Sequence, residues 1–318
     1  MGNGMAQDKG TTQTSEIRER DLHGAGARSP LFWKLMLVGI ALIWGFSFCM
    51  MKDATDALPT FTLLAIRFVI AALIMLALFR KSIVRNLNVR SVAVGLGVGL
   101  VLWGAYVAQT LGLSQTTAGK NAFLTGTYCV LVPFVSYMLL REKLTFYNVG
   151  AALICLVGIG FVALDNFQIG AGDVLTLLGA VFFALQISVV AKFGRDMDVN
   201  TMTFWMFAAV GVLSAGAAIL FEPRVPPSTW TPGLVANMAF LAVVCTCINM
   251  LVQNLGLAHV PSSTGSLLLS LESPSGVFFS VMLAGEALTP RLVTGFALIF
   301  FAIVLSETHF DFLKRGAH

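Results

Sequence analysis

Long runs of apolar residues alternate with short polar turns along most of this chain. A helix needs about 17 to 25 apolar residues to cross the hydrocarbon core of a bilayer, and the runs have this length. The turns carry Pro, Gly, Asp, Asn or basic residues, which end helices or remain in water. The pattern predicts an all-α, polytopic membrane protein with ten transmembrane helices, at residues 33–51, 61–79, 91–112, 119–140, 145–164, 173–193, 201–221, 233–256, 262–284 and 290–308.

One part of this pattern occurs twice. Residues 109–145 are QTLGLSQTTAGKNAFLTGTYCVLVPFVSYMLLREKLT, and residues 253–289 are QNLGLAHVPSSTGSLLLSLESPSGVFFSVMLAGEALT. Adding 144 to each residue number carries the first segment onto the second without a gap, so that Gln109 falls on Gln253. A match of this length indicates that the chain consists of two copies of one membrane unit.

The two copies are expected to be inverted relative to each other. Five helices per copy is an odd number, so the second copy, residues 173–308, enters the membrane from the side opposite to the first, residues 33–164. Of the 20 Lys and Arg residues, fifteen lie in segments on the side of the N-terminus, four lie on the other side and Arg67 lies within a span. The positive-inside rule therefore predicts that both termini are cytoplasmic.

The two ends of the chain, residues 1–32 and 309–318, are expected to be cytoplasmic tails. The N-terminal segment is polar and mixed in charge and has nothing to bury, which predicts disorder. The first apolar run begins near Trp33 and leads directly into a span, so we expect no cleaved signal peptide.

Composition excludes several classes of protein. Charged residues are 11% and AVILMFWYC residues 57% of the 318, with a mean hydropathy of +0.84, whereas soluble domains carry roughly 25% charged residues. The net charge of +4 does not indicate a nucleic-acid partner, because topology accounts for the basic residues in the short loops. The five cysteines lie in apolar segments without CxxC spacing, so we interpret them as small buried residues and not as a disulfide or metal framework.

Enzyme chemistry has little support in the sequence. The four His residues fall in tails or a loop, and the motifs GxSxG, HExxH and GxxxxGK[ST] are absent. We therefore predict no catalytic residue, no metal, no cofactor and no ATP-driven pumping by this chain. Transport would have to draw on a gradient of the substrate or of an ion.

Short motifs in both halves indicate a family. They are IWGFSFCMMK (43–52), PTFTLLAIRF (59–68), TTAGKNAFLTGTYCVLVPF (116–134), REKLT (141–145), SLESPSGVFF (270–279) and GEALT (285–289). Together they resemble the EamA-type transporters of the drug/metabolite transporter superfamily, over nearly everything after residue 33. The resemblance implies a ten-helix bacterial inner-membrane carrier, usually an exporter of amino acids or related small metabolites, with the substrate cavity between the halves. Phe183, which replaces the aromatic residue equivalent to Trp44, and Ser273, at a usual proline position, depart from the pattern, so the halves are not expected to be fully equivalent.

Polar residues on the predicted helices are candidates for a substrate site. Asn121, Thr125 and Tyr128 are spaced i, i+4 and i+7, so they form one polar stripe, and serines at 262, 266, 270 and 273 form the equivalent stripe in the ninth span. Such stripes either line a ligand or form bonds between packed helices, worth roughly 0.6 kcal/mol each. Aromatic and amide groups from other helices complete an apolar-walled pocket with few hydrogen-bonding groups. The predicted substrate-binding residues are Trp44, Ser47, Trp103, Tyr106, Lys120, Asn121, Thr125, Tyr128, Gln186, Asn249, Gln253, Ser266 and Ser270.

Three ionisable residues in or near the spans need a separate explanation, since a charge at the bilayer centre costs roughly 2.5 to 3.5 kcal/mol on the permissive insertion scale. Glu272 is a candidate for proton coupling or for a bond to a neighbouring helix. Lys120 either attracts an anionic group or extends its ammonium group to water. We expect Arg67 to be a structural anchor that pairs with a helix C-terminus or with Asp53 or Asp56.

Two further carboxylates, Glu142 and Glu286, are placed at equivalent positions by the repeat. We expect them to begin the fifth and tenth spans, where the exposed N–H groups and the helix dipole favour a carboxylate. They are therefore predicted to be helix caps without a role in transport.

The hypothesis that follows is a secondary transporter, most simply an exporter, of a small polar or amphipathic metabolite that works by alternating access, with proton coupling left open. Its partners would be the small-molecule substrate and the lipid bilayer, with no oligomeric state implied. The alternative is a membrane-embedded sensor or lipid-modifying protein without transport activity. A sensor would show an appended soluble domain and an enzyme a cluster of catalytic residues near one interface, and the sequence shows neither pattern.

Overall fold

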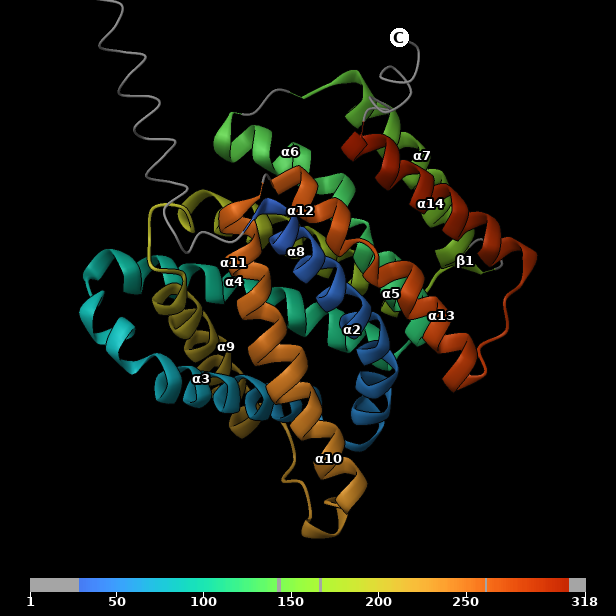
Figure 1. Ribbon diagram of the computed structural model, residues 1–318. Helices are drawn as coiled ribbons and strands as arrows, with labels where there is room; N and C mark the ends of the chain where they lie inside the picture. Colours follow the sequence, from blue (N-terminus) through green and yellow to red (C-terminus); the bar gives the residue numbers. More distant parts are fainter. Residues whose placement is uncertain (1–28, 142–143, 166–167, 261, 309–318) are drawn as a thin grey trace, which may run out of the picture.

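The described part of the protein is almost entirely helical. The computed structural model describes residues 29–141, 144–165, 168–260 and 262–308 (Figure 1). The short elements are an antiparallel pair, β1 (Leu164–Asp165) with β2 (Gln168–Ile169), and a 3₁₀ turn, η1 (Pro227–Thr229). The helices are α2 (Pro30–Ala57), α3 (Thr60–Arg85), α4 (Val89–Ser114), α5 (Ala118–Gly126), α6 (Tyr128–Leu140), α7 (Phe146–Ala163), α8 (Ala171–Phe193), α9 (Val199–Phe221), α10 (Pro232–Phe240), the π-helix η2 (Leu241–Ile248), α11 (Asn249–His259), α12 (Ser262–Leu269), α13 (Glu272–Ala284) and α14 (Pro290–Thr308).

Eight helical segments of the described residues are long and apolar enough to cross a membrane, by length and composition. They are α2, α3, α4, α8 and α9, together with the consecutive helices α5 and α6, α10 to α11, and α12 and α13, while α7 and α14 contain shorter apolar stretches. The prediction of an all-α membrane protein is confirmed, and the number of ten spans and their division into repeats stay predictions. Because α2 already begins at Pro30, the predicted tail 1–32 is helical at its end, while residues 1–28 and 309–318 lie outside the described part.

Helix starts are fixed by side chains that accept hydrogen bonds from free backbone N–H groups. At the start of α4, the Asn88 side chain accepts from the Ser91 N–H at 2.9 Å, and the Ser91 hydroxyl accepts from the Asn88 N–H at 3.1 Å, which is a capping box. The start of α3 is capped by another helix. Glu222, at the end of α9, accepts from the N–H groups of Phe61 at 2.6 Å and Thr62 at 2.7 Å, which ties α9 to the neighbouring α3.

Two of the membrane-spanning segments are interrupted at equivalent positions. Between α5 and α6, Thr127 has φ −61° and ψ −15°, and between α12 and α13, Leu271 has φ −61° and ψ −14°. The helix that follows each interruption ends in a left-handed residue, Arg141 with φ 54° and Gly285 with φ 66°. The members of each pair are 144 residues apart, so the backbone geometry has the same spacing as the sequence repeat.

The left-handed conformation of Gly285 gives a stability prediction. A Cβ added there would meet no atom within 4 Å, so Gly285→Ala tests the backbone conformation alone. We expect this change to lower the free energy of unfolding by about 1 kcal/mol, because an L-residue is disfavoured at positive φ. Thermal unfolding in detergent measures the effect as a lower Tm. Arg141→Gly is the matched control, since it relieves the same strain, and an equal loss of stability in that variant would contradict the explanation.

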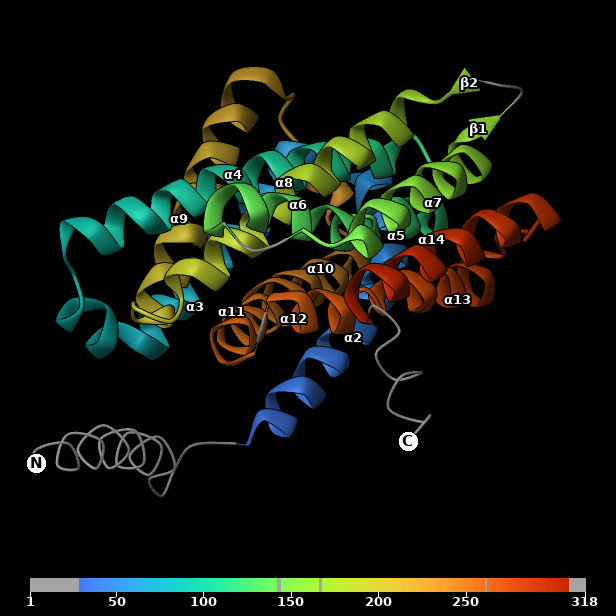
Figure 2. The same cartoon turned by 90° about the horizontal axis from the view of Figure 1, so that it is seen from above.

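Helices from the first and second parts of the chain pack against each other. α2 crosses α13, α4 packs against α8 and α9, and α3 packs along α9. α7 and α14 lie side by side at one edge of the molecule (Figures 1 and 2). The long helix that begins with α10 and ends with α11 contains the π-helix η2 in its middle. π-helical turns are rare and frequently occur at functional sites. The residues in contact with η2 are therefore candidates for a functional site.

Candidate substrate site

A cavity lies where helices from both parts of the chain meet. Its volume is about 50 Å³, which holds one or two water molecules. Sites for small molecules measure roughly 300 Å³ or more, so the cavity in this conformation is too small for such a ligand. The lining residues are Trp44, Ser47, Phe48, Met51, Arg67, Tyr106, Gln109, Thr110, Leu113, Thr125, Tyr128, Phe183, Ile187, Met250, Gln253 and Glu272.

Lining residues that are 144 apart in the sequence lie close together. The Tyr106 hydroxyl on α4 donates a hydrogen bond to the Met250 sulfur on α11 at 3.6 Å. Tyr128, the first residue of α6, lies next to Glu272, the first residue of α13. The two interrupted segments thus present a phenol and a carboxyl group to each other at the cavity. These two positions are equivalent in the repeat, but their side chains differ in chemistry.

Two glutamines at equivalent positions also line the cavity. Gln109 on α4 donates to the Thr125 hydroxyl on α5 at 3.2 Å. Gln253 on α11 donates to the side-chain oxygen of Gln186 on α8 at 3.3 Å. Gln186 is fully buried and lies behind Gln253 instead of at the cavity wall, so its effect on a ligand would pass through Gln253.

The π-helix η2 supplies backbone and side-chain partners to the cavity wall. The Trp44 indole N–H donates to the Cys245 carbonyl oxygen at 2.8 Å, which holds α2 against η2. The Thr246 hydroxyl donates to the Leu241 carbonyl oxygen at 2.7 Å and accepts a hydrogen bond from Arg67 Nε at 2.9 Å. The wider turn of η2 therefore places Thr246 where it orients a buried guanidinium group.

Arg67 is a buried cation in the wall of the cavity, with 2% of its surface exposed. Besides Thr246, its Nη1 donates to the Met51 sulfur at 2.9 Å. The guanidinium carbon lies 5.2 Å from the ring centre of Tyr106 and 5.8 Å from that of Phe68, distances at which a cation is attracted to an aromatic face. The direct contacts of the guanidinium group are thus to neutral side chains.

The expectation that Arg67 pairs with Asp53 or Asp56 is wrong. Asp56 pairs with Lys52 at 3.4 Å, one turn earlier on α2, and Asp53 is exposed. Both carboxylates lie at the end of α2, whereas Arg67 lies about two turns inside α3, and this difference in depth separates the charges.

Seven of the fourteen predicted binding and coupling residues line the cavity. They come from α2, α4, α5, α6, α11 and α13, and most are aromatic or carry an amide or hydroxyl group. Their positions agree with a role in substrate binding, which stays a proposal. The seven are Trp44, Ser47, Tyr106, Thr125, Tyr128, Gln253 and Glu272.

Other predicted residues contact protein groups away from the cavity instead of lining it. Asn121 donates to the Thr176 hydroxyl at 2.7 Å and so joins α5 to α8. Asn249 donates to a backbone carbonyl of α2 at 3.4 Å. Trp103 stacks on Phe61 with ring centres 6.3 Å apart, which is a packing contact between α4 and α3. These three side chains hold helices together in this conformation.

Ser266, Ser270 and Ser273 of the ninth predicted span do not line the cavity. The Ser270 hydroxyl donates to the Leu267 carbonyl oxygen at 2.6 Å, and the Ser266 carbonyl oxygen accepts from the Cys129 thiol at 3.0 Å. Ser273 donates to the Ala122 carbonyl oxygen at 3.1 Å, across to α5. Ser270 and Ser273 thus bond to backbone groups in this conformation, and the assignment of Ser266 and Ser270 to a substrate site stays a proposal.

Several lining residues were missed from sequence. Gln109 begins the repeated segment and matches Gln253, and this equivalence was a usable signal. Arg67 was visible as a charge inside a span, but its partners were not. The apolar residues Leu113, Ile187 and Met250 are of the types that fill any membrane-protein core, so no sequence signal distinguishes them.

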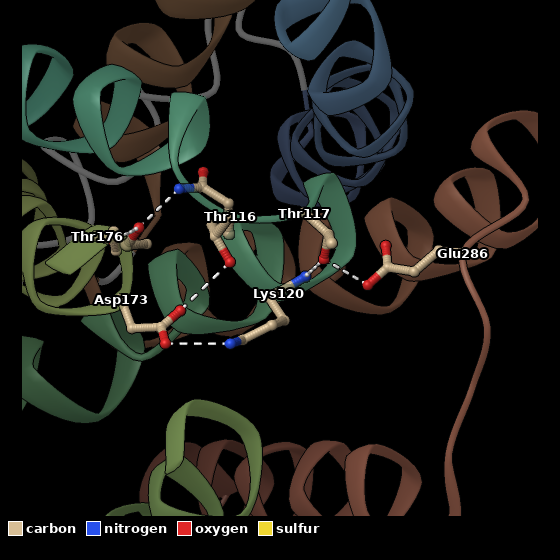
Figure 3. Close-up of polar contacts among 8 residues, drawn as sticks. Thr116, Thr117, Lys120, Asp173, Thr176 and Glu286 are labelled. Carbon is tan, nitrogen blue, oxygen red and sulfur yellow. Dashed lines mark hydrogen bonds and ion pairs between the residues drawn. The ribbon is translucent and has the colours of Figure 1, made fainter. Parts of the chain in front are cut away.

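An ion pair joins the two parts of the chain beside the start of α5. Lys120 Nζ lies 3.0 Å from a carboxylate oxygen of Asp173 on α8, and Figure 3 shows the lysine extended toward it. The Asp173 side chain is 3% exposed and the Lys120 side chain 19% exposed. Thr116 adds a hydrogen bond to the same carboxylate at 3.3 Å. Lys120 is therefore occupied by a carboxylate of the protein itself and does not face the cavity.

Glu286 lies in the same region and corrects another expectation. It was predicted to cap its own span, but α14 begins only at Pro290. The Glu286 carboxylate instead accepts hydrogen bonds from the Thr117 hydroxyl at 2.5 Å and the Gly119 N–H at 3.0 Å, at the start of α5 (Figure 3). The Ser280 hydroxyl donates to it as well. The turn at Gly285 directs the carboxylate toward α5, whereas Glu142 lies outside the described residues.

The family is settled by comparison with known proteins. The sequence profile of the EamA-like transporter family matches residues 31–164 and again residues 170–308. This chain belongs to the EamA-like transporter family. The resemblance inferred from the motifs is thereby confirmed, and the chain is a multi-pass membrane protein of a transporter family.

Relatives of this EamA-like protein are similar over nearly their whole length. An uncharacterized transporter of Archaeoglobus fulgidus is 30% identical over 283 residues, which cover 89% of this chain and 88% of the relative. An S-adenosylmethionine/S-adenosylhomocysteine transporter of Chlamydia trachomatis is 26% identical over 298 residues, which cover 87% of this chain and 88% of the relative. A crystal structure with 20% identity has a TM-score of 0.67 and covers 88% of this chain and 98% of its own, a likeness in fold.

Proposed function

We propose that this EamA-like protein is a secondary transporter that exports a small metabolite, an amino acid or a related compound, across the cell inner membrane by alternating access. In this proposal ten transmembrane helices form two inverted five-helix halves, residues 33–164 and 173–308, with both termini in the cytoplasm. The observation that carries the proposal is the central cavity, which residues from both halves line at positions related by the repeat. The chlamydial relative is named for transport of small metabolites, which supports the substrate class.

The network beside the start of α5 would be the outer closure of the carrier. With the N-terminus in the cytoplasm, α5 begins at the outer face. Lys120 of the first half meets Asp173 of the second, and Glu286 of the second half meets Thr117 of the first. Opening the cavity outward requires that these contacts separate.

Other contacts between the halves lie at the opposite end of the helices. Lys192 on α8 donates to the Leu139 carbonyl oxygen on α6 at 3.1 Å. Trp33 on α2 stacks on His259 on α11, with ring centres 4.4 Å apart. With contacts of both kinds in place the cavity measures about 50 Å³, so the substrate would enter when one set separates and leave when the other does.

Glu272 is the residue that we propose for proton coupling. It is 6% exposed, lines the cavity and lies at the interruption between α12 and α13. Buried ionisable groups within membrane spans mark proton or substrate pathways in transporters. A proton and a cationic group of the substrate would compete for the same carboxylate. Export of the substrate would therefore depend on uptake of a proton.

Counterflow in proteoliposomes tests the proposed function. Vesicles with purified protein are preloaded with amino acids, nucleobases or organic acids, and uptake of the same labelled compound is followed with and without a pH gradient. We expect exchange of at least one class of compound. Transport of this compound should be faster when it moves in the direction opposite to the flow of protons. Absence of exchange for every compound, with protein that unfolds cooperatively and is therefore folded, would favour the sensor hypothesis.

A further inference from the structure

Arg67 lines the cavity without a carboxylate of the described residues in ion-pair contact, and Glu272 is the acidic residue that lines the same cavity. In the part of the chain that the structure describes, the ion pairs are Lys52 with Asp56 and Lys120 with Asp173, and neither involves Arg67. Burying an unpaired charge is unfavourable, so buried arginines are normally paired with a carboxylate or a phosphate. The pairing partner of Arg67 is therefore expected to come from outside the chain.

The neighbours of Arg67 orient its guanidinium group but do not neutralise it. Thr246 accepts from Nε at 2.9 Å, and the Met51 sulfur, a weak acceptor, receives Nη1 at 2.9 Å. The ring of Tyr106 lies against the same group. A guanidinium has five N–H donors in a planar fork, which is more than these three neutral neighbours use.

We propose that Arg67 binds a carboxylate group of the transported substrate and makes this carrier selective for compounds that have one. The proposal rests on the transport function proposed above and deepens it. A carboxylate matches the planar fork of the guanidinium with two parallel hydrogen bonds, and charge-assisted bonds of this kind are about twice as strong as neutral ones. Lys120, the other basic candidate, is already paired with Asp173.

The opposite charge in the cavity completes the description of the substrate. Glu272 belongs to the second half of the chain and Arg67 to the first, and both line the same cavity. The phenol rings of Tyr106 and Tyr128 lie beside Arg67 and Glu272 respectively. A small zwitterion matches these charges once the cavity widens, with its carboxylate at Arg67, its cationic group at Glu272 and its apolar part against the aromatic wall.

The test compares compounds that differ only in the proposed group. Counterflow is measured for phenylalanine, methionine and leucine, each beside its primary amide, which keeps the size and the amine but lacks the carboxylate. The variants are Arg67→Met, which removes the charge at similar length, and Arg67→Lys, which keeps the charge without the fork. Arg80→Met is the matched control, because Arg80 is an exposed residue on the same helix.

The wild-type protein and Arg80→Met are expected to transport at least one free acid about tenfold or more better than its amide, as judged by apparent affinity. Arg67→Met should transport acid and amide equally, and Arg67→Lys should lie between. Equal transport of acid and amide by the wild-type protein, or an acid preference that survives in Arg67→Met, would overturn the assignment of Arg67. Exchange of nucleobases alone would also overturn it while leaving the carrier function intact, and no exchange of any compound would overturn both. If Arg67→Met does not fold, the wild-type comparison still tests the preference for a carboxylate, and an acid preference in Arg67→Lys as large as in the wild-type protein would overturn the assignment of Arg67.

Discussion

Replacing Glu272 by Gln is expected to abolish the effect of a pH gradient on transport while exchange without a gradient remains measurable. Glutamine has nearly the same size and keeps the contact with Tyr128, but it cannot release a proton. For one proton per substrate molecule, a gradient of one pH unit supplies about 1.4 kcal/mol, which is roughly a tenfold accumulation. In the variant this factor should fall to about one. The measurement is counterflow in proteoliposomes with the internal and external pH equal or one unit apart.

A second carboxylate provides the control for this experiment. Asp53→Asn removes an acidic group that is exposed near the end of α2, so it should leave the gradient effect unchanged. Acceleration by the gradient that persists in Glu272→Gln would contradict the assignment and would move the coupling to another group. A variant that loses both exchange and the cooperative thermal transition would be misfolded, and Glu272→Asp, which keeps the carboxylate, then decides between loss of the charge and loss of the fold.

Replacing Lys120 by Met is expected to open the outer side of the cavity. The change leaves the buried Asp173 carboxylate without its cation, and breaking such a pair costs about 3 kcal/mol, the low end of the range because Lys120 keeps partial exposure. A difference of that size shifts the ratio of open to closed carriers by roughly 100-fold. The free energy of the closed state rises, because the carboxylate reaches water only when the contact with α5 separates.

Cysteine labelling measures this opening. Thr110 lines the cavity, so Thr110→Cys is introduced into a protein whose five native cysteines have been replaced, and a membrane-impermeant maleimide is added from the outer side. Lys120→Met should increase the labelling rate more than tenfold. The double variant Lys120→Met/Asp173→Leu should label nearly as slowly as the parent, because it contains no unpaired charge. If Lys120→Met labels no faster than the parent, the ion pair is not part of the closure.

An exposed ion pair in the same region is the matched control. The side chains of Lys52 and Asp56 are 29% and 63% exposed, and such surface pairs contribute about 0 to 1 kcal/mol. Asp56→Asn, which removes this ion pair and keeps the Lys52 bonds to the carbonyls of Leu113 and Ser114, should therefore change the labelling rate by no more than about fivefold, and so should Lys52→Met if those bonds add little. An effect of Lys52→Met as large as that of Lys120→Met would show that any loss of positive charge at this face opens the protein.

The comparison of prediction with structure is clearest for the residues of the fourth and ninth predicted spans. Asn121 and Thr125 lie on one predicted face, yet Thr125 lines the cavity while Asn121 bonds to Thr176 on α8. Glu272 lies on the same predicted span as Ser266 and Ser270, yet only Glu272 of these three lines the cavity. The spacing along a helix predicts which residues share a face, but the neighbouring helix decides what that face meets.

Charged residues show the same limit. The presence of Arg67, Lys120 and Glu286 at or inside the spans was evident from the chain alone, and the need for a partner followed from the cost of burying a charge. Some of their partners are distant in the sequence: Lys120 bonds to Asp173, 53 residues away, and Arg67 bonds to Thr246, 179 residues away. Contacts over such separations depend on how helices pack, so local sequence patterns carried no information about them.

Contiguous patterns in the chain were sufficient for the all-α membrane class, the approximate helix bounds and the family, because apolar runs of spanning length and motifs are properties of neighbouring residues. The spacing of 144 also relates Tyr128 to Glu272, but the interruptions at these positions were not predicted, because residues 119–140 and 262–284 were each expected to form one helix. Only the tertiary structure decided that Arg67 faces the cavity unpaired and that Glu286 caps α5 instead of α14. Those outcomes depend on the crossing of helices from distant parts of the chain, since the same polar side chain can meet a cavity, a backbone carbonyl or an opposite charge according to the helix packed against it.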